Sequence, residues 1–136
     1  MAGYSGTPLP QKLGIKAGAR LGLFAAPTGF AMTLAPLPDE VTTTTALGGA
    51  LDVALFFTRS QSELKKRFAA LAKAIAPVGS LWIAWPKKSS GVATDLDENR
   101  VRAIGLERGL VDVKVCAVDE IWSGLKFVVR VKDRPK

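Results

Sequence analysis

Three short, almost continuously apolar stretches constrain the fold of this chain more than any other feature. They are 19–26 (ARLGLFAA), 51–57 (LDVALFF) and 81–85 (LWIAW). Such runs are typical of strands that are buried on both faces, because helices cover both sides of a parallel sheet. The three runs therefore predict central parallel strands rather than a helical bundle or an all-β domain.

Helical patterns separate the apolar runs. After Ser60, apolar residues recur at spacings of four, three and four, and Ser60 with Glu63 matches a capping box at a helix start. Asp95 and Glu98 repeat that capping pattern before a second amphipathic segment. A short helix is predicted for 27–35, since proline suits the first helical turn. Strands that alternate with helices predict an α/β fold with a mainly parallel sheet.

The end of the chain favours a β-hairpin. Segments 110–118 and 125–132 are two adjacent strand-like stretches, and residues 119–124 join them. One strand of the pair should run antiparallel to the rest of the sheet. The expected fold is therefore a three-layer, Rossmann-like α/β domain that closes with an antiparallel hairpin.

The domain organisation follows from the same patterns. A segment rich in Gly and Pro, residues 1–18, predicts an extended N-terminal arm. One domain should then occupy 19–132, followed by a basic tail at 133–136. The 136 residues are enough to bury a core without metal or disulfide support.

Composition limits the chemistry. The chain has no histidine, which removes the commonest general base and transition-metal ligand, and we predict no metal site and no catalytic residue. Nineteen Lys and Arg against twelve Asp and Glu give a net charge of +7, which favours anionic partners. The charge is spread along the chain without a recognition motif, so a nucleic-acid partner is not expected. The single cysteine, Cys116, fits a small buried hydrophobe.

No stretch predicts secretion or membrane insertion. The N-terminal residues lack the apolar core of a signal peptide, and no apolar run approaches the length of a membrane span. An unpaired cysteine gives no indication of an oxidising compartment. We therefore expect a cytoplasmic protein without a membrane partner.

The stretch 85–95 (WPKKSSGVATD) leaves the third apolar run and is the main candidate for a binding site. Ligands of parallel α/β sheets bind beyond the carboxyl ends of the strands, where this loop should lie. Its lysines supply charge, its hydroxyls and bare glycine backbone supply hydrogen bonds, and a helix start near Asp95 favours an anion. The predicted ligand-binding residues are Lys87, Lys88, Ser89, Ser90, Gly91, Thr94, Arg59 and Trp122.

Each of these residues also has a purely structural interpretation. The loop is equally consistent with a solvated connection. Arg59 either contacts a carboxylate or phosphate or is a solvated residue before the helix cap. Trp122, next to Ser123 and Gly124, is a lid over a ligand, an anchor of an interface, or part of the hairpin packing.

The order of these segments resembles the Rossmann-like class I methyltransferases over residues 19–132. Residues 76–79 (APVG) stand where that family has a helix–PGG–strand passage, and one strand–helix unit is missing, so the chain resembles a truncated form. More closely still, GTPLPQKLGIKAG, WPKKSSGVATDL and VDVKVCAVDEIWSGLKFVVR look like a small bacterial family without an established activity.

The methyltransferase resemblance implies a cofactor turn that this chain lacks. The family has a glycine-rich turn after its first strand, because only bare backbone approaches adenosylmethionine closely. Here residues 25–29 (AAPTG) contain one glycine and a proline, and 43–46 (TTTA) lack the acidic residue that would hold the ribose. The cofactor site is degenerate, and no cofactor is predicted.

The sequence thus favours a non-catalytic binding domain for a small phosphate- or carboxylate-bearing ligand. Two alternatives stay open: a protein-interaction module that uses Trp122 and the N-terminal arm, and a divergent adenosylmethionine-dependent methyltransferase. A small sheet with an exposed edge also favours self-association.

Overall fold

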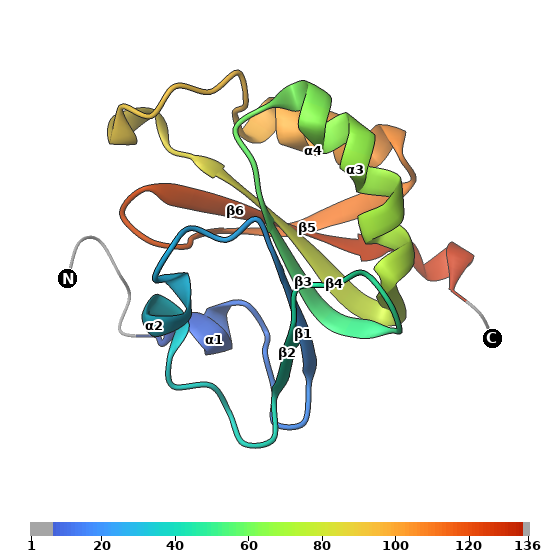
Figure 1. Ribbon diagram of the computed structural model, residues 1–136. Coiled ribbons are helices and arrows are strands. Elements are labelled where there is room, and N and C mark those ends of the chain that lie inside the picture. Colours follow the sequence, from blue (N-terminus) through green and yellow to red (C-terminus); the bar gives the residue numbers. More distant parts are fainter. Residues whose placement is uncertain (1–6, 135–136) are drawn as a thin grey trace.

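The protein is described by a computed structural model over residues 7–134, which form a six-stranded sheet between helices on both faces (Figure 1). The elements, in chain order, are α1 (Leu9–Lys12), β1 (Arg20–Phe24), α2 (Phe30–Leu34), β2 (Thr42–Thr44), β3 (Leu51–Phe57), α3 (Gln61–Ala74), β4 (Ile75–Pro86), η1 (Lys88–Ser90), α4 (Glu98–Glu107), β5 (Leu110–Ala117), β6 (Trp122–Val129) and η2 (Val131–Asp133).

The strand order is β2-β1-β3-β4-β6-β5. β2, β1, β3 and β4 are parallel, whereas β6 runs antiparallel to both β4 and β5. The prediction of a mainly parallel sheet that closes with an antiparallel hairpin is confirmed. The strand order reverses beside β1, which pairs with β2 on one side and β3 on the other.

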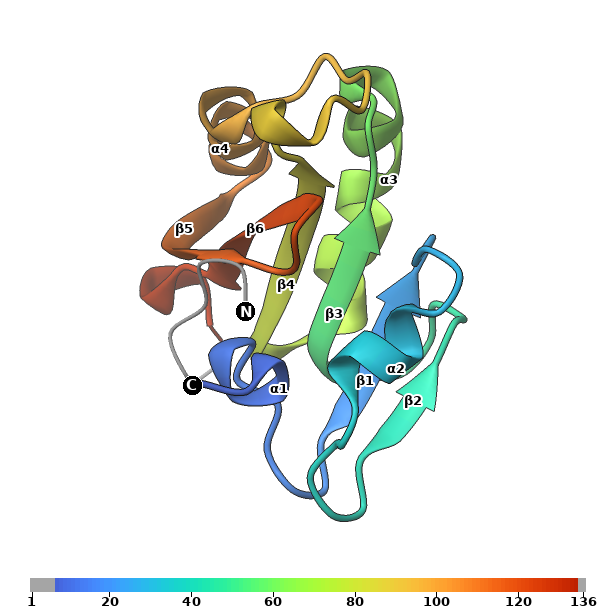
Figure 2. The same cartoon turned by 90° about the vertical axis from the view of Figure 1, so that its left-hand side faces the viewer.

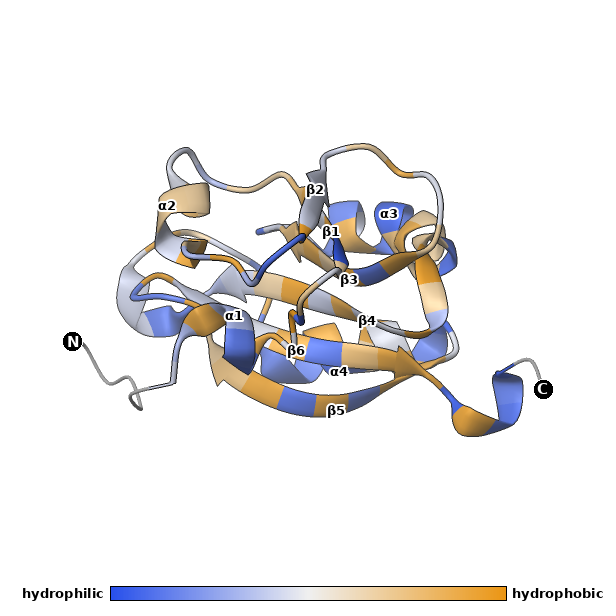
Figure 3. Cartoon of the chain, turned by 90° about the horizontal axis from the view of Figure 1, so that it is seen from below, coloured by the Kyte–Doolittle hydropathy of each residue, from blue (hydrophilic) through white to orange (hydrophobic). Residues whose placement is uncertain are grey.

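Two hydrophobic cores lie on the two faces of the sheet. The core under α3 and α4 contains Phe56 and Trp85, and the core under α1 and α2 contains Leu55 and Trp82. Successive side chains of a strand point to opposite faces, which places the two tryptophans in different cores, as predicted. Figure 3 shows the alternation of hydrophobic and hydrophilic residues along the outer strand β5. The three layers of the fold are thus confirmed.

The two longer helices begin at polar caps. Ser60 accepts a hydrogen bond from the backbone N–H of Glu63, as the capping box predicts. The predicted cap at Asp95 is wrong, because Asp97 is the N-cap of α4 and accepts from the N–H of Arg100. Both helices present buried apolar residues to the sheet. No helix within residues 7–134 combines the length and apolar character needed to cross a membrane.

The N-terminal arm is part of the domain. The prediction of an extended arm is wrong for its described residues, 7–18, because α1 forms a helical turn there and Leu13 and Ile15 are buried in the core. The indole N–H of Trp82 donates to the carbonyl of Leu13 at 3.0 Å and ties this segment to the sheet. The rest of the predicted arm and residues 135–136 of the tail lie outside the described residues.

Three element boundaries differ from those expected. α2 begins at Phe30, because Pro27 forms a turn in which its carbonyl accepts the N–H of Phe30. β4 begins at Ile75 rather than after Gly79, and its pairing with β3 is irregular at this point. β6 begins at Trp122, so the turn before it is shorter than predicted.

Candidate functional site

The loop after β4 lines a cleft of about 660 Å3 at the carboxyl end of that strand. In Figure 2 this loop lies above the end of β4, between α4 and the start of α3. Four of the predicted residues line the cleft, and they are joined by residues of α4, of the α4 cap and of β6. The polar lining residues are Lys87, Lys88, Thr94, Asp95, Asp97, Glu98, Arg100 and Ser123, and Gly91 adds bare backbone.

The β5–β6 turn lies at the same edge of the sheet. The backbone N–H of Lys87 donates to the carbonyl of Ile121 at 2.7 Å, and Pro86 is paired with Trp122 across the strands. This contact fixes where the loop leaves the sheet. It also places the residues around Trp122 beside the loop. The sequence alone did not show at which end of the strands these residues lie.

Two of the predicted hydroxyls hold the loop in shape. The hydroxyl of Ser90 donates to the carbonyl of Lys87 at 2.6 Å and accepts from the N–H of Val92. The hydroxyl of Thr94 donates to the carbonyl of Arg59 at 2.7 Å and accepts from the N–H of Leu96. Both hydroxyls are therefore engaged within the protein.

The carboxylates of the cleft have partners in the protein. Asp97 forms an ion pair with Arg100 at 3.0 Å, and Glu98 forms one with Arg102 at 2.7 Å. The guanidinium of Arg102 donates hydrogen bonds to Glu98 and to Asp112 on β5, and these bonds raise its pKa above the ordinary value. Asp95 accepts the backbone N–H of Gln61 at 2.8 Å and so closes the start of α3.

The lysines of the cleft do not have such partners. Within residues 7–134, the side chains of Lys87 and Lys88 make no hydrogen bond or ion pair, and Ser89 beside them is exposed. Gly91 ends the turn with φ of 75°, in the left-handed region that favours glycine. The loop therefore presents two ammonium groups from a backbone that is fixed on both sides.

Arg59 borders a second cleft of about 520 Å3, next to the first. Its lining includes Ser60, Glu63 and Ala93, and Ala93 belongs to both clefts. The side chain of Arg59 is exposed, and its backbone carbonyl accepts the hydroxyl of Thr94. Arg59 thus lies beside the loop, as the sequence predicts, without lining the cleft that contains the two lysines.

Trp122 belongs to an aromatic cluster at the same edge. Its ring packs edge-on against Phe57, with ring centroids 5.1 Å apart, and Phe57 packs edge-on against Phe30 at 4.8 Å. Phe30 and Phe57 are buried, and Trp122 is half-buried. The three rings fill the space between the loop after β1 and the end of β3, where the strand order reverses.

The loop after β1, residues 25–29, is not the glycine-rich turn that binds the cofactor in class I methyltransferases. Ala25 has φ of 56° and Gly29 has φ of 84°, so two residues adopt left-handed backbone. The turn borders a cavity of about 600 Å3 that also contacts Thr45, after β2, and Arg67 of α3. No acidic side chain lines this cavity within the described residues.

Cys116 and the acidic residues offer no metal centre. Among residues 7–134, no three cysteine or carboxylate side chains come together as metal ligands would. Cys116 is half-buried on β5, and burial raises the pKa of its thiol above the ordinary value, against a smaller opposite effect of Lys12 and Lys114. Cys116 packs against the core under α1 and α2 but is only partly buried, whereas the sequence predicts a buried residue.

The strand order and the two helical layers define a methyltransferase-like fold of the Rossmann type. A methyltransferase described as SAM-dependent from Aquifex aeolicus superposes with a TM-score of 0.63 at 14% identity and covers 88% of this chain and 87% of its own. The magnesium protoporphyrin IX methyltransferase of Synechocystis, solved with bound SAM, gives 0.58 at 12% identity over 90% and 74%. The precorrin-6y C5,15-methyltransferase of Geobacter metallireducens gives 0.59 at 9% identity over 90% and 86%.

In sequence, no family model and no curated protein matches the chain. The structural likeness, at these low identities, shows the fold alone. This structural likeness confirms the expectation of a truncated methyltransferase-like fold.

The residues at the first turn do not fit the cofactor of the structural neighbours. Pro27 removes a backbone donor from the turn, and Thr45 follows β2 where the family has an acidic residue. Ligands of this fold class bind at the reversal of strand order, where Phe30 and Phe57 are in edge contact and Phe30 also lines the cavity after β1.

Sequence reasoning missed the charged residues that α4 contributes to the cleft. Asp97, Glu98 and Arg100 belong to the cap and first turn of α4, and they line the cleft because the loop folds back over the start of α3. The signal that could have found them is the acidic character of a first helical turn directly after the loop.

Proposed function

We propose that the cleft beside the β4 loop binds a small anionic ligand through Lys87 and Lys88. The observation that supports this proposal is the balance of charge in the cleft. The carboxylates of Asp97 and Glu98 are paired with arginines and that of Asp95 accepts a backbone N–H, whereas the side chains of the two lysines have no partner within residues 7–134. A phosphate or carboxylate group would supply the missing counter-charge.

The fixed shape of the loop supports the same proposal. Its first residue is held by the hydrogen bond from Lys87 to Ile121, and its end is held by the bond from Thr94 to Arg59. A loop that is already ordered loses less conformational entropy when a ligand binds. The cleft volume of about 660 Å3 is within the range of small-molecule sites, about 300–1,000 Å3.

We propose binding without turnover at this cleft. The chain has no histidine, and the carboxylates that line the cleft already accept hydrogen bonds from arginines or from a helix start. A carboxylate that is engaged in this way is not placed to take a proton from a ligand, as a general base must be.

Methyl transfer is the second candidate, and the fold favours it. The structural neighbours include methyltransferases solved with SAM or its product, and they cover about 90% of this chain. Against it stand the turn at 25–29, which has one glycine and a proline, and the absence of an acidic residue at 43–46. The two candidates predict different ligands.

A ligand panel tests both candidates. Thermal unfolding is measured with sugar phosphates, citrate, adenosylmethionine and its demethylated product. Ligand at a hundredfold above its Kd stabilises by about 2.7 kcal/mol, which is easily measured. The variants are Lys87→Glu/Lys88→Glu and a matched control, Lys65→Glu/Lys66→Glu, which makes the same change of charge at exposed positions of α3.

We expect an anion to stabilise the wild type and the control and to lose most of its effect in the Lys87→Glu/Lys88→Glu variant. Equal losses in both variants would mean that the net charge alone attracts the anion, and would refute the site. Stabilisation by adenosylmethionine, together with transfer of a labelled methyl group, would establish the second candidate instead.

A further inference from the structure

A second pocket lies on the sheet face that α1 and α2 leave uncovered, toward the edge opposite the β4 loop. Its volume is about 420 Å3. Its floor is formed by three neighbouring strands, in which Val53 of β3 pairs with Ser80 of β4, and Ser80 pairs with Val128 of β6. The floor is exposed here because α1 has four residues and α2 has five, too few to cover this face.

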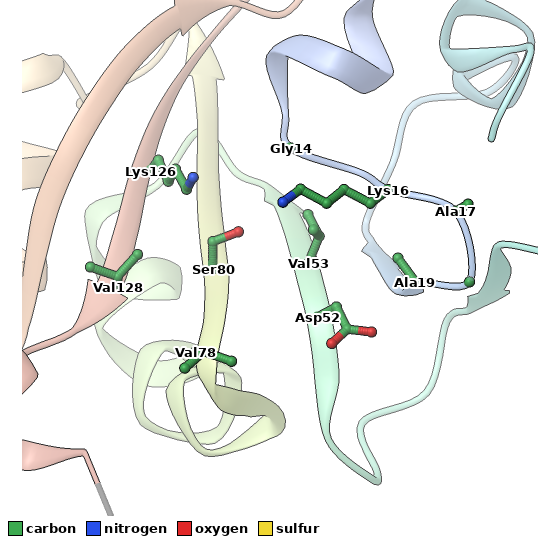
Figure 4. A pocket seen from close by; sticks show the side chains of 11 residues that line it. Gly14, Lys16, Ala17, Ala19, Asp52, Val53, Val78, Ser80, Lys126 and Val128 are labelled. Atoms are coloured by element: carbon green, nitrogen blue, oxygen red, sulfur yellow. The ribbon is translucent and has the colours of Figure 1, made fainter.

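Two lysines from distant parts of the chain converge over this floor. Lys16 belongs to the loop between α1 and β1, and Lys126 lies in β6. Figure 4 shows their side chains pointing toward one another across the pocket. The ammonium of Lys126 lies close to the backbone of the same loop, 3.8 Å from where a Cβ on Gly14 would be.

Neither ammonium is neutralised by a neighbour. Within residues 7–134, Lys16 and Lys126 make no hydrogen bond or ion pair through their side chains. Asp52, the acidic residue of the pocket lining, uses Oδ2 to accept the backbone N–H of Arg20 at 2.8 Å. Two like charges that face each other repel, so an anion between them would be favourable.

Ser80 adds a hydroxyl group to the lining of the pocket. Its exposed fraction is 6%, so it is one of the few buried polar residues of the domain. Its hydroxyl makes no hydrogen bond within residues 7–134 and is not one of the fully buried polar atoms, and in Figure 4 it points into the space between the two lysines. The hydroxyl is therefore available as a hydrogen-bond donor to a ligand in the pocket.

We propose that this pocket is a second binding site, for a small phosphate monoester. The phosphate would lie between Lys16 and Lys126 and accept a hydrogen bond from Ser80, and the organic part would pack against Val53 and Val128. Two positive charges match the double negative charge of a phosphate monoester near neutral pH better than the single charge of a carboxylate. This proposal is independent of the site at Lys87 and Lys88.

The test is an NMR titration of the full chain with glycerol 3-phosphate, with glycerol as the uncharged control. We expect saturable shifts of the backbone amides near Lys16, Ser80 and Lys126, and no such shifts with glycerol. Loss of one charge-assisted contact in Lys16→Met or Lys126→Met should weaken binding about tenfold or more. Ser80→Ala should weaken it less, and Lys65→Met, an exposed position on the other face, should leave it unchanged.

Each other outcome would overturn the proposal. Absence of saturable shifts at millimolar glycerol 3-phosphate would do so, as would equal weakening by Lys65→Met. Shifts confined to residues 86–94 would place the phosphate at the β4 loop alone. The Lys87→Glu/Lys88→Glu variant separates the two sites, because it should abolish binding at the loop and leave the shifts near Ser80. Thermal midpoints of all variants establish that each one is folded.

Discussion

Substitution of Gly105 by alanine tests the packing of α4 against the sheet. Gly105 lies inside the helix and is buried, and a Cβ there would lie 2.1 Å, 2.4 Å and 2.7 Å from three ring atoms of Phe127. The ring cannot move easily, because it is fully buried and packs edge-on against Phe68 with centroids 5.6 Å apart. Close packing of this kind resists an added methyl group.

The expected net effect is a loss of stability. Alanine favours a helix interior over glycine by about 1 kcal/mol, whereas overpacking a filled core costs about 1–3 kcal/mol. Three contacts below the normal van der Waals distance place the cost at the upper end of that range. Gly105→Ala should therefore lower the free energy of unfolding by about 2 kcal/mol, the difference between these two terms.

Urea unfolding followed by tryptophan fluorescence measures this effect. Ala103→Gly, at an exposed position of the same helix, serves as the control and should cost about 1 kcal/mol from propensity alone. In a double-mutant cycle, Phe127→Leu should reduce the cost of the added methyl group, since a smaller side chain leaves room for it. A Gly105→Ala variant as stable as the wild type would refute the reasoning.

Three further predictions concern the sheet and its edge. Trp82→Phe removes the donor to the buried carbonyl of Leu13, and should lower the free energy of unfolding by about 2 kcal/mol, whereas unchanged stability in urea would contradict a structural role of this bond. Because burial raises the pKa of Cys116, its alkylation by iodoacetamide at about pH 8 should be slower than that of a free thiol. The neutral thiol is favoured in the folded state, so its contribution to stability is complete below the pKa that Cys116 has in the unfolded chain and is lost as the pH rises through the pKa that it has in the folded chain. Alkylation as fast as that of glutathione would contradict a raised pKa of Cys116. Finally, we expect self-association in sedimentation velocity that Trp122→Ala weakens, and a monomer at all concentrations would exclude it.

The sequence predicts those elements whose local pattern and burial agree. The run 51–57 coincides with β3, because six of its seven residues are apolar and the run lies between clear turn signals. The start of β4 was missed, because Pro77 and Gly79 are typical of a helix end. In the structure Gly79 is needed inside the strand, where a Cβ would lie 2.6 Å from the carbonyl oxygen of Leu51. Only the register with β3 reveals this requirement.

The candidate sites differ in how far the sequence predicts them. The position of Lys87 and Lys88 at a carboxyl edge follows from a loop that leaves a buried strand. The carboxylates beside these lysines belong to the cap and first turn of α4, where they are paired with arginines. No local sequence pattern shows that this turn lies in the cleft. The approach of Lys16 to Lys126 depends on the antiparallel pairing of β6 with β4, which sets the face of the sheet from which Lys126 projects and its position along β4. Long-range register of this kind is absent from local sequence.

The short helices on one face of the sheet also determine where the protein should open first. Helices as short as α1 and α2 are unstable alone and depend on the contacts that the sheet provides. Amide hydrogens near Leu13 should therefore exchange with solvent through local opening, long before those of β3 and β4, which lie at the centre of the sheet. A ligand that joins Lys16 to Lys126 would connect this labile segment to the sheet, so its binding should slow the exchange of the segment without affecting α3 or α4.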